Sequence, residues 1–149
     1  MMRIHRRRVL GTLPLLALPS LGRAADEPPL QDILFGSCLD THEHPMLDAT
    51  LKLPRDLFLF MGDNIYAAHK GGLAMIRGKY GLLKGSRFFK GLRNKPILAT
   101  WDDHDFGQND GGADYAGKKD AQREFWNWLG EPPDSPKRGQ EGVYQSQVF

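Results

Sequence analysis

Three short apolar runs constrain the fold of this chain more strongly than any other feature of its sequence. They span residues 33–35, 57–61 and 96–101, and each leads directly into polar residues. None of them alternates apolar with polar side chains, which is typical of parallel strands that are buried on both faces of a sheet. Segments with helical features separate the runs. We therefore predict a β-α-β-α-β order and an α/β fold class with right-handed crossovers.

Helices are predicted over residues 46–53, 73–92 and 118–129. The second of these carries apolar residues at roughly helical spacing, but three glycines favour a break within it: Gly78, Gly81 and Gly85. The third ends at Gly130, shortly before Pro132. Beyond it, residues 142–149 are predicted to open a fourth strand.

Residues 1–25 have the features of an export signal. Arginines precede an apolar run over residues 9–21, and the small residues Ala24 and Ala25 follow it. Arg6-Arg7-Arg8 also fits a twin-arginine pattern, and a plain secretory signal fits as well. The apolar run is too short to span a bilayer, so we expect no retained membrane anchor. We therefore expect an exported protein, periplasmic or extracellular, that meets the membrane only during export.

The charge of the full chain is misleading, because much of the positive charge lies in the predicted signal. The chain has 20 Lys and Arg against 18 Asp and Glu, a net charge of +2. Five arginines fall within residues 1–25, so the remainder carries fifteen basic and eighteen acidic residues, a net charge of −3. This balance argues against binding to a nucleic acid backbone.

Polar residues with metal-ligating side chains follow each of the three apolar runs. Cys38 follows the first, Asp63 the second, and Asp102-Asp103-His104 the third. The carboxyl ends of parallel strands meet at one edge of a sheet, where sites form in open α/β folds. Adjacent carboxylates repel each other unless a cation holds them together, so we predict a metal site there. For Cys38, the only cysteine, a buried small side chain and a metal-bound thiolate are both open.

Three motifs, read in order, resemble the alkaline phosphatase D family of calcineurin-like metallophosphatases. They are Gly36-Ser37-Cys38, residues 54–66 with the sequence Pro-Arg-Asp-Leu-Phe-Leu-Phe-Met-Gly-Asp-Asn-Ile-Tyr, and residues 101–107 with the sequence Trp-Asp-Asp-His-Asp-Phe-Gly. Similarity continues to residues 142–144. The resemblance implies that residues 26–149 are the N-terminal portion of a metallophosphatase domain, a β-α-β-α-β half of an α/β sandwich. The later half of the family, with its further ligands, has no counterpart in this sequence, so we expect an incomplete fold.

The resemblance also implies roles for particular residues. Cys38 would be a thiolate ligand of iron, Asp63 a bridging ligand and Tyr66 a phenolate ligand of iron. Asp103 would bind metal, and His104 would contact the substrate phosphate or protonate the leaving group. Three further candidates match less closely: Asn64, Asp102 and Asn109. The implied cofactors are iron and calcium, and the implied substrates are small phosphate mono- or diesters that metal-activated water hydrolyses.

Other functions remain open from the sequence. A haloacid-dehalogenase-like phosphatase would use Asp103 as nucleophile and Asp105 as acid, but the Thr or Val expected after that pair is missing. A cysteine phosphatase fits less well, because no arginine lies at the required distance after Cys38. An exported protein that binds metal or phosphate without catalysis is the alternative from a different class.

The histidines outside the motif favour structural interpretations. His42 and His44 have alternate spacing, but we interpret them as loop residues, with Asp40 or Thr41 capping the following helix. His69 lies beside Lys70-Gly71-Gly72 and is interpreted as a solvated loop residue.

Overall fold

The computed structural model describes residues 29–40, 43–67 and 72–149. The predicted export signal, His42 and His69 lie outside the described residues. The strands are β1 (Ile33–Gly36), β2 (Leu57–Met61) and β3 (Ile97–Thr100). The helices are α1 (Pro45–Thr50), α2 (Gly72–Gly85), α3 (Arg87–Leu92), α4 (Asp103–Phe106), α5 (Lys118–Leu129) and the 3₁₀ helix η1 (Pro136–Arg138).

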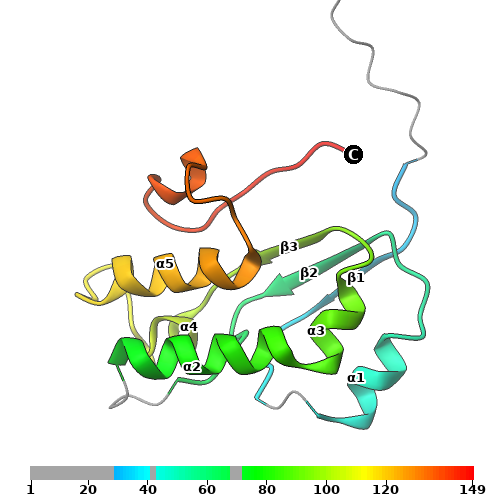
Figure 1. Ribbon diagram of the computed structural model, residues 1–149, viewed down its shortest axis with the longest axis horizontal. Coiled ribbons are helices and arrows are strands. Elements are labelled where there is room, and N and C mark those ends of the chain that lie inside the picture. Colours follow the sequence, from blue (N-terminus) through cyan, green and yellow to red (C-terminus); the bar gives the residue numbers. More distant parts are fainter. Residues whose placement is uncertain (1–28, 41–42, 68–71) are drawn as a thin grey trace, which may run out of the picture.

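The three strands form one parallel sheet in the order β1-β2-β3 (Figure 1). Leu59 of β2 is paired with Phe35 of β1 on one side and Leu98 of β3 on the other. The predicted α/β class and the predicted parallel arrangement are confirmed. The parallel arrangement places the carboxyl ends of the three strands at one edge.

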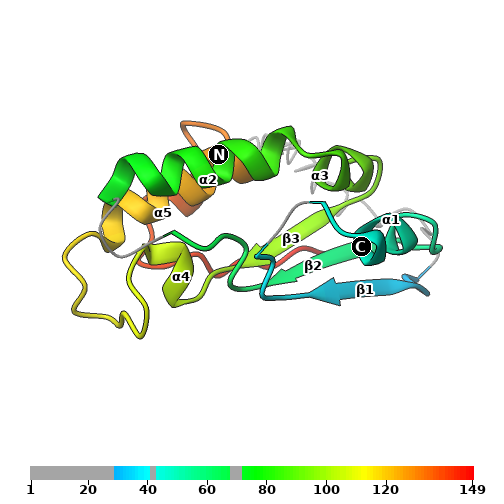
Figure 2. The same ribbon diagram turned by 90° about the horizontal axis from the view of Figure 1, so that it is seen from below.

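Helices cover one face of the sheet. Figure 2 shows α2, α3 and α5 together on that side. Phe58 and Phe60 of β2 project into this layer, where Phe58 meets Phe88 with ring centroids 5.7 Å apart and Phe60 meets Trp128 at 5.2 Å. These rings belong to the hydrophobic core that fills the space between the sheet and the helices.

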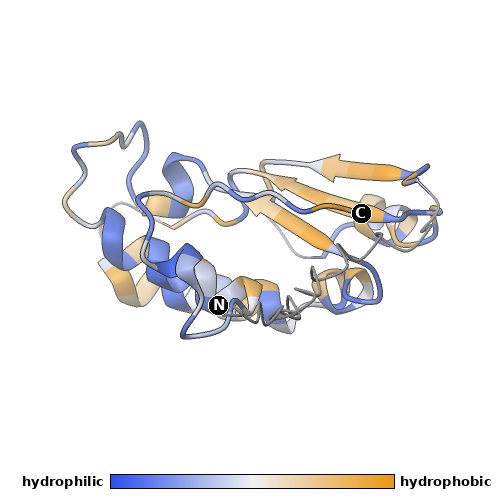
Figure 3. Cartoon of the chain, turned by 90° about the horizontal axis from the view of Figure 1, so that it is seen from above, coloured by the Kyte–Doolittle hydropathy of each residue, from blue (hydrophilic) through white to orange (hydrophobic). Residues whose placement is uncertain are grey.

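The opposite face of the sheet is apolar and, except at Leu57, partly or largely exposed. Side chains alternate between the two faces along each strand, so Ile33, Phe35, Leu59 and Met61 share this side. Phe35 is 73% exposed and Met61 51% exposed, and the strands appear orange along their lengths in Figure 3. Parallel sheets normally have both faces covered, so this face differs from the usual arrangement.

The helix predictions hold with local corrections. The helix over residues 118–129 is confirmed. The break in the 73–92 helix falls at Gly85, because Ser86 Oγ accepts a hydrogen bond from Phe89 N (3.1 Å) and begins α3. The helix predicted over 46–53 is shorter, and its cap was assigned wrongly: His44 Nδ1 accepts the hydrogen bond from Met46 N at 3.1 Å.

The predicted fourth strand is wrong. Residues 142–149 contain no strand. The segment approaches the free edge of β3 through a side chain, with Gln145 Nε2 donating to Ala99 O at 2.5 Å, and only Val143 of this segment is buried. Among the described residues, none of the helices has the length and apolarity needed to cross a membrane.

Candidate metal centre

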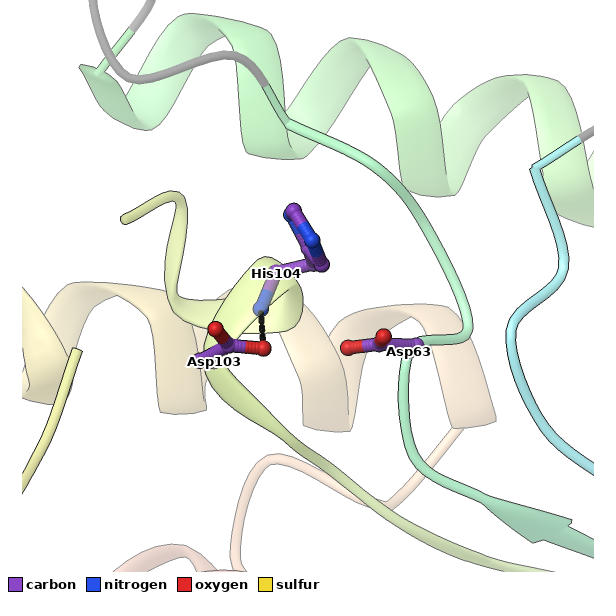
Figure 4. A group of neighbouring side chains, drawn as sticks. All are labelled: Asp63, Asp103 and His104. Carbon is purple, nitrogen blue, oxygen red and sulfur yellow. Dashed lines mark hydrogen bonds between the residues drawn. The ribbon is translucent and has the colours of Figure 1, made fainter. Parts of the chain in front are cut away.

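Two loops at the carboxyl edge of the sheet bring three ligand-type side chains together. Asp63 follows β2, and Asp103 and His104 form the first turn of α4 after β3. One ligand atom from each of these residues lies within 4.8 Å of the others. In Figure 4 the carboxylates of Asp63 and Asp103 point toward each other. The structure thus places together residues that the strand order predicted to meet.

The backbone at this edge is tightly turned. Gly62 has φ +103°, and Asp63 and Cys38 also lie at positive φ, 50° and 57°. A Cβ on Gly62 would lie 3.0 Å from Asp102 Cβ, so glycine allows the loop after β2 to pack against the loop after β3. Cys38 N and Leu39 N donate to the carbonyls of Gly62 and Asp63, which joins the loop after β1 to the same edge.

Asp63 has one satisfied and one unsatisfied carboxylate oxygen. Oδ2 accepts a hydrogen bond from Tyr66 Oη at 3.2 Å and lies 3.8 Å from Cys38 Sγ. Oδ1 is buried and has no hydrogen-bond partner among the described residues. Leaving such an oxygen unpaired costs roughly 1–3 kcal/mol. A cation at this point would remove that cost.

Tyr66 lies between Asp63 and His104. Its ring centroid is 4.2 Å from that of His104, with the planes 38° apart. Burial raises the pKa of the Tyr66 phenol well above its usual value, and the hydrogen bond with Cys38 and the charge of Asp63 raise it further. The phenol is therefore protonated in the metal-free chain, and the phenolate role implied by the resemblance requires a cation to replace the proton.

Asp103 is held as a carboxylate. Burial opposes ionisation, but the N–H groups of Asp110 and His104 donate to its two oxygens, and together with the nearby His104 they lower the pKa of Asp103 below its usual value. The hydrogen bond from His104 N is 2.8 Å long. Asp103 therefore offers negative charge next to Asp63 at neutral pH.

Cys38 lies beside this group but outside it. Its thiol is free and exposed, so the interpretation as a buried small side chain is wrong. Its sulfur contacts Asp63 Oδ2, but it is not one of the three residues whose ligand atoms lie within 4.8 Å of one another. The thiolate role stays a prediction.

The three secondary candidates have structural contacts. Asn64 is buried, and its Nδ2 donates to Thr100 O at 2.7 Å and to Asp105 Oδ2 at 3.2 Å. Asp102 caps α4, with its Oδ1 accepting from Asp103 N at 2.9 Å. Asn109 Nδ2 donates to Asp110 Oδ2 at 2.6 Å. These contacts give Asn64 Nδ2 and Asp102 Oδ1 partners within the protein, but Asn64 Oδ1 is buried and has no hydrogen-bond partner among the described residues.

Asp105 is the residue whose importance the sequence analysis missed. It has no exposed surface and accepts four hydrogen bonds, from Asn64 N, Asn64 Nδ2, Asp102 N and Tyr80 Oη. Burial raises its pKa to about 6 although these hydrogen bonds lower it. The Asp-x-x-Asp spacing of residues 102 and 105 after an apolar strand is a capping-box signal that points to part of this role.

The same contacts argue against the haloacid-dehalogenase-like alternative. That mechanism needs Asp105 to offer a proton to substrate. Both Asp105 oxygens instead accept hydrogen bonds inside the protein, and the side chain has no access to solvent.

Comparisons with protein-family models, curated proteins and solved structures found no match to this chain. The resemblance to the alkaline phosphatase D family therefore rests on the sequence motifs alone.

Proposed function

We propose that this chain is the N-terminal part of an exported, metal-dependent phosphoric ester hydrolase of the alkaline phosphatase D type. The observation that carries the proposal is the meeting of Asp63, Asp103 and His104 at the carboxyl edge of a parallel sheet, with ligand atoms within 4.8 Å. The order of the three motifs in the sequence supports the same function.

The side chains present fit a bound cation. Asp63 Oδ1, which has no partner in the described part of the chain, and the ionised Asp103 are oxygen donors suited to calcium. The thiol of Cys38 and the phenol of Tyr66 suit ferric iron once deprotonated. Bound metal supplies polarisation of the phosphoryl oxygens and lowers the pKa of a coordinated water toward about 7.

The protein's own groups have separate tasks in this proposal. Asp63 and Asp103 provide the negative charge that retains the cation. Before iron binds, Tyr66 orients Asp63 through its hydroxyl, and its ring packs against the imidazole of His104. His104, half-buried at the start of α4, contacts a phosphoryl oxygen or donates a proton to the departing ester oxygen.

A second function, binding of metal or phosphate without turnover, is favoured by one observation. The sheet that carries the site has an exposed apolar face, with Phe35 73% exposed. Among the described residues, no second layer covers this face, and a hydrolytic centre needs walls that exclude water from the reacting groups.

Hydrolysis of p-nitrophenyl phosphate and of bis(p-nitrophenyl) phosphate tests the proposal. The full chain is loaded with iron and calcium and compared with Asp63→Asn and with Asp134→Asn, a matched control on an exposed loop. Turnover that is lost in Asp63→Asn and kept in Asp134→Asn supports the hydrolase. Metal binding without turnover supports the binding function instead, and absence of both activities from folded protein overturns both proposals.

A further inference from the structure

We propose that Asp105 is a positioning residue that fixes the distance between Asp63 and the Asp103-His104 pair, so that the cation site is formed before the cation arrives. The inference rests on the proposed function for the identity of the site. It concerns a residue that contacts none of the proposed ligands through its side chain.

A single oxygen of Asp105 joins the two loops that carry the ligands. Oδ2 accepts from Asn64 N at 3.2 Å and from Asp102 N at 3.0 Å. Asn64 directly follows Asp63, and Asp102 directly precedes Asp103. Each bond therefore holds the backbone immediately next to a proposed ligand.

The same carboxylate is anchored to the core. Its Oδ1 accepts from Tyr80 Oη of α2 at 2.8 Å, and Tyr80 stacks on Trp128 of α5 with ring centroids 5.0 Å apart. Asn64 adds a parallel link, because its Nδ2 donates both to Asp105 Oδ2 and to Thr100 O at the end of β3. The position of the two loops is thereby tied to the helical layer.

Helix capping alone does not account for these contacts. Of the hydrogen bonds that the Asp105 side chain accepts, the capping box of α4 uses only the one from Asp102 N, and α4 is only four residues long. The two bonds from Asn64 come from the neighbouring strand's loop and add nothing to that cap. They connect the loop after β2 with the loop after β3, next to the residues that carry the proposed metal-ligating side chains.

Three variants of the full chain separate positioning from general stability. Asp105→Ala removes the two loop bonds, which are the hydrogen bonds that Asp105 Oδ2 accepts from Asn64 N and Asp102 N. Asp105→Asn keeps an oxygen for Asn64 N and Asp102 N and an amino group that can donate to Tyr80 Oη. Tyr80→Phe is the matched control, since it removes the anchor in the core and leaves both loop bonds intact. Binding of Mn²⁺ alone is measured by calorimetry, because Mn²⁺ accepts carboxylate and imidazole ligands.

The expected result is a loss of Mn²⁺ affinity of roughly 10- to 100-fold in Asp105→Ala. Asp105→Asn restores affinity to within about threefold of the unmodified chain, and Tyr80→Phe stays in that range although it loses stability. Affinity that is unchanged in Asp105→Ala, or that falls equally in Tyr80→Phe, overturns the positioning role.

Amide hydrogen exchange in the unmodified chain provides a measurement that needs neither folded variants nor metal. The amides of Asn64 and Asp102 are expected to be protected to a similar degree and to exchange together. Free exchange of either amide overturns the inference. If the unmodified chain binds no Mn²⁺, the proposed function fails, and the exchange result alone then decides whether Asp105 holds the two loops.

Discussion

Two carboxylates at the same edge of the sheet have opposite surroundings. Asp105 is fully buried, and its oxygens accept four hydrogen bonds. Asp63 lies at positive φ, faces the carboxylate of Asp103, and has one buried oxygen without a partner among the described residues. Removing a carboxylate whose oxygens are all paired leaves its buried donors unsatisfied, whereas an oxygen without a partner costs free energy that a ligand can recover. The comparison therefore separates a structural centre at Asp105 from a functional one at Asp63.

The largest expected effect comes from removing the structural centre. Asp105→Ala leaves the backbone amides of Asn64 and Asp102 and the hydroxyl of Tyr80 without acceptors, so we expect the free energy of unfolding to fall by at least about 3 kcal/mol. Urea denaturation measures this loss. A loss below about 1 kcal/mol would mean that the hydrogen bonds around Asp105 do not hold the fold, and the contrast with Asp63 would disappear.

Gly62→Ala tests the close approach between the two regions. The residue lies at φ +103°, and a Cβ would meet Asp102 Cβ at 3.0 Å, so we expect a loss of about 1–3 kcal/mol. Gly78→Ala is the matched control: Gly78 lies in α2 with nothing within 4 Å of an added Cβ, and alanine there should stabilise the chain by about 0.5–1 kcal/mol. Thermal unfolding of both variants checks these signs, and equal effects would contradict the account of this turn.

An ion pair outside both regions shows how much an ordinary polar contact contributes to the free energy of unfolding. Arg77 Nη2 lies 2.8 Å from Glu124 Oε1, with the arginine side chain 63% exposed. Glu124→Gln should cost about 1 kcal/mol or less. The hydrogen bond from Arg77 lowers the pKa of Glu124 below 4.5. The contribution of this ion pair to the free energy of unfolding is therefore complete above pH 4.5. It is lost as the pH falls through the lowered pKa of Glu124.

Unfolding free energies at pH 7 and pH 3 check this prediction. The difference between the unmodified chain and Glu124→Gln should be largest at pH 7 and smaller at pH 3. A difference that grows on acidification would contradict the assigned cause.

Asp63→Asn is expected to change the stability least, and any change should be an increase rather than a loss. In metal-free protein this change removes a charge that faces Asp103, so stability should stay within about 1 kcal/mol of the unmodified chain or rise slightly. Urea denaturation in the presence of EDTA measures it. A loss as large as that of Asp105→Ala would show that Asp63 is itself structural.

The sheet could be predicted from the sequence because the signals for its strands lie within short stretches of the chain. Uniformly apolar runs identified β1, β2 and β3, and Gly130 marked the end of α5. The break among three glycines could not be assigned, because Ser86 decides it by capping α3 while Gly78 and Gly81 lie on the exposed side of α2. The fourth strand failed because an apolar pattern does not reveal that Gln145 contacts β3 through its side chain.

For the site, the sequence predicted which residues would meet but not what holds them. Strand order was enough to bring Asp63, Asp103 and His104 to one edge. The role of Asp105 depends on Asn64 and Tyr80, 41 and 25 residues away, and no local pattern shows those contacts. Asn64, Asp102 and Asn109 were secondary candidates from the resemblance, and each makes a side-chain hydrogen bond within the protein, although Asn64 Oδ1 has no partner among the described residues.

Thermal unfolding of the full chain in Mn²⁺ and in EDTA tests most directly whether Asp63 belongs to a cation site. Saturating Mn²⁺, at about 100 times its dissociation constant, should add roughly 2.7 kcal/mol and raise the Tm by about 5–10 °C. Asp63→Asn should show no such rise, while Asp134→Asn should match the unmodified chain. A rise of equal size in Asp63→Asn, or no rise in the unmodified chain, would contradict the account.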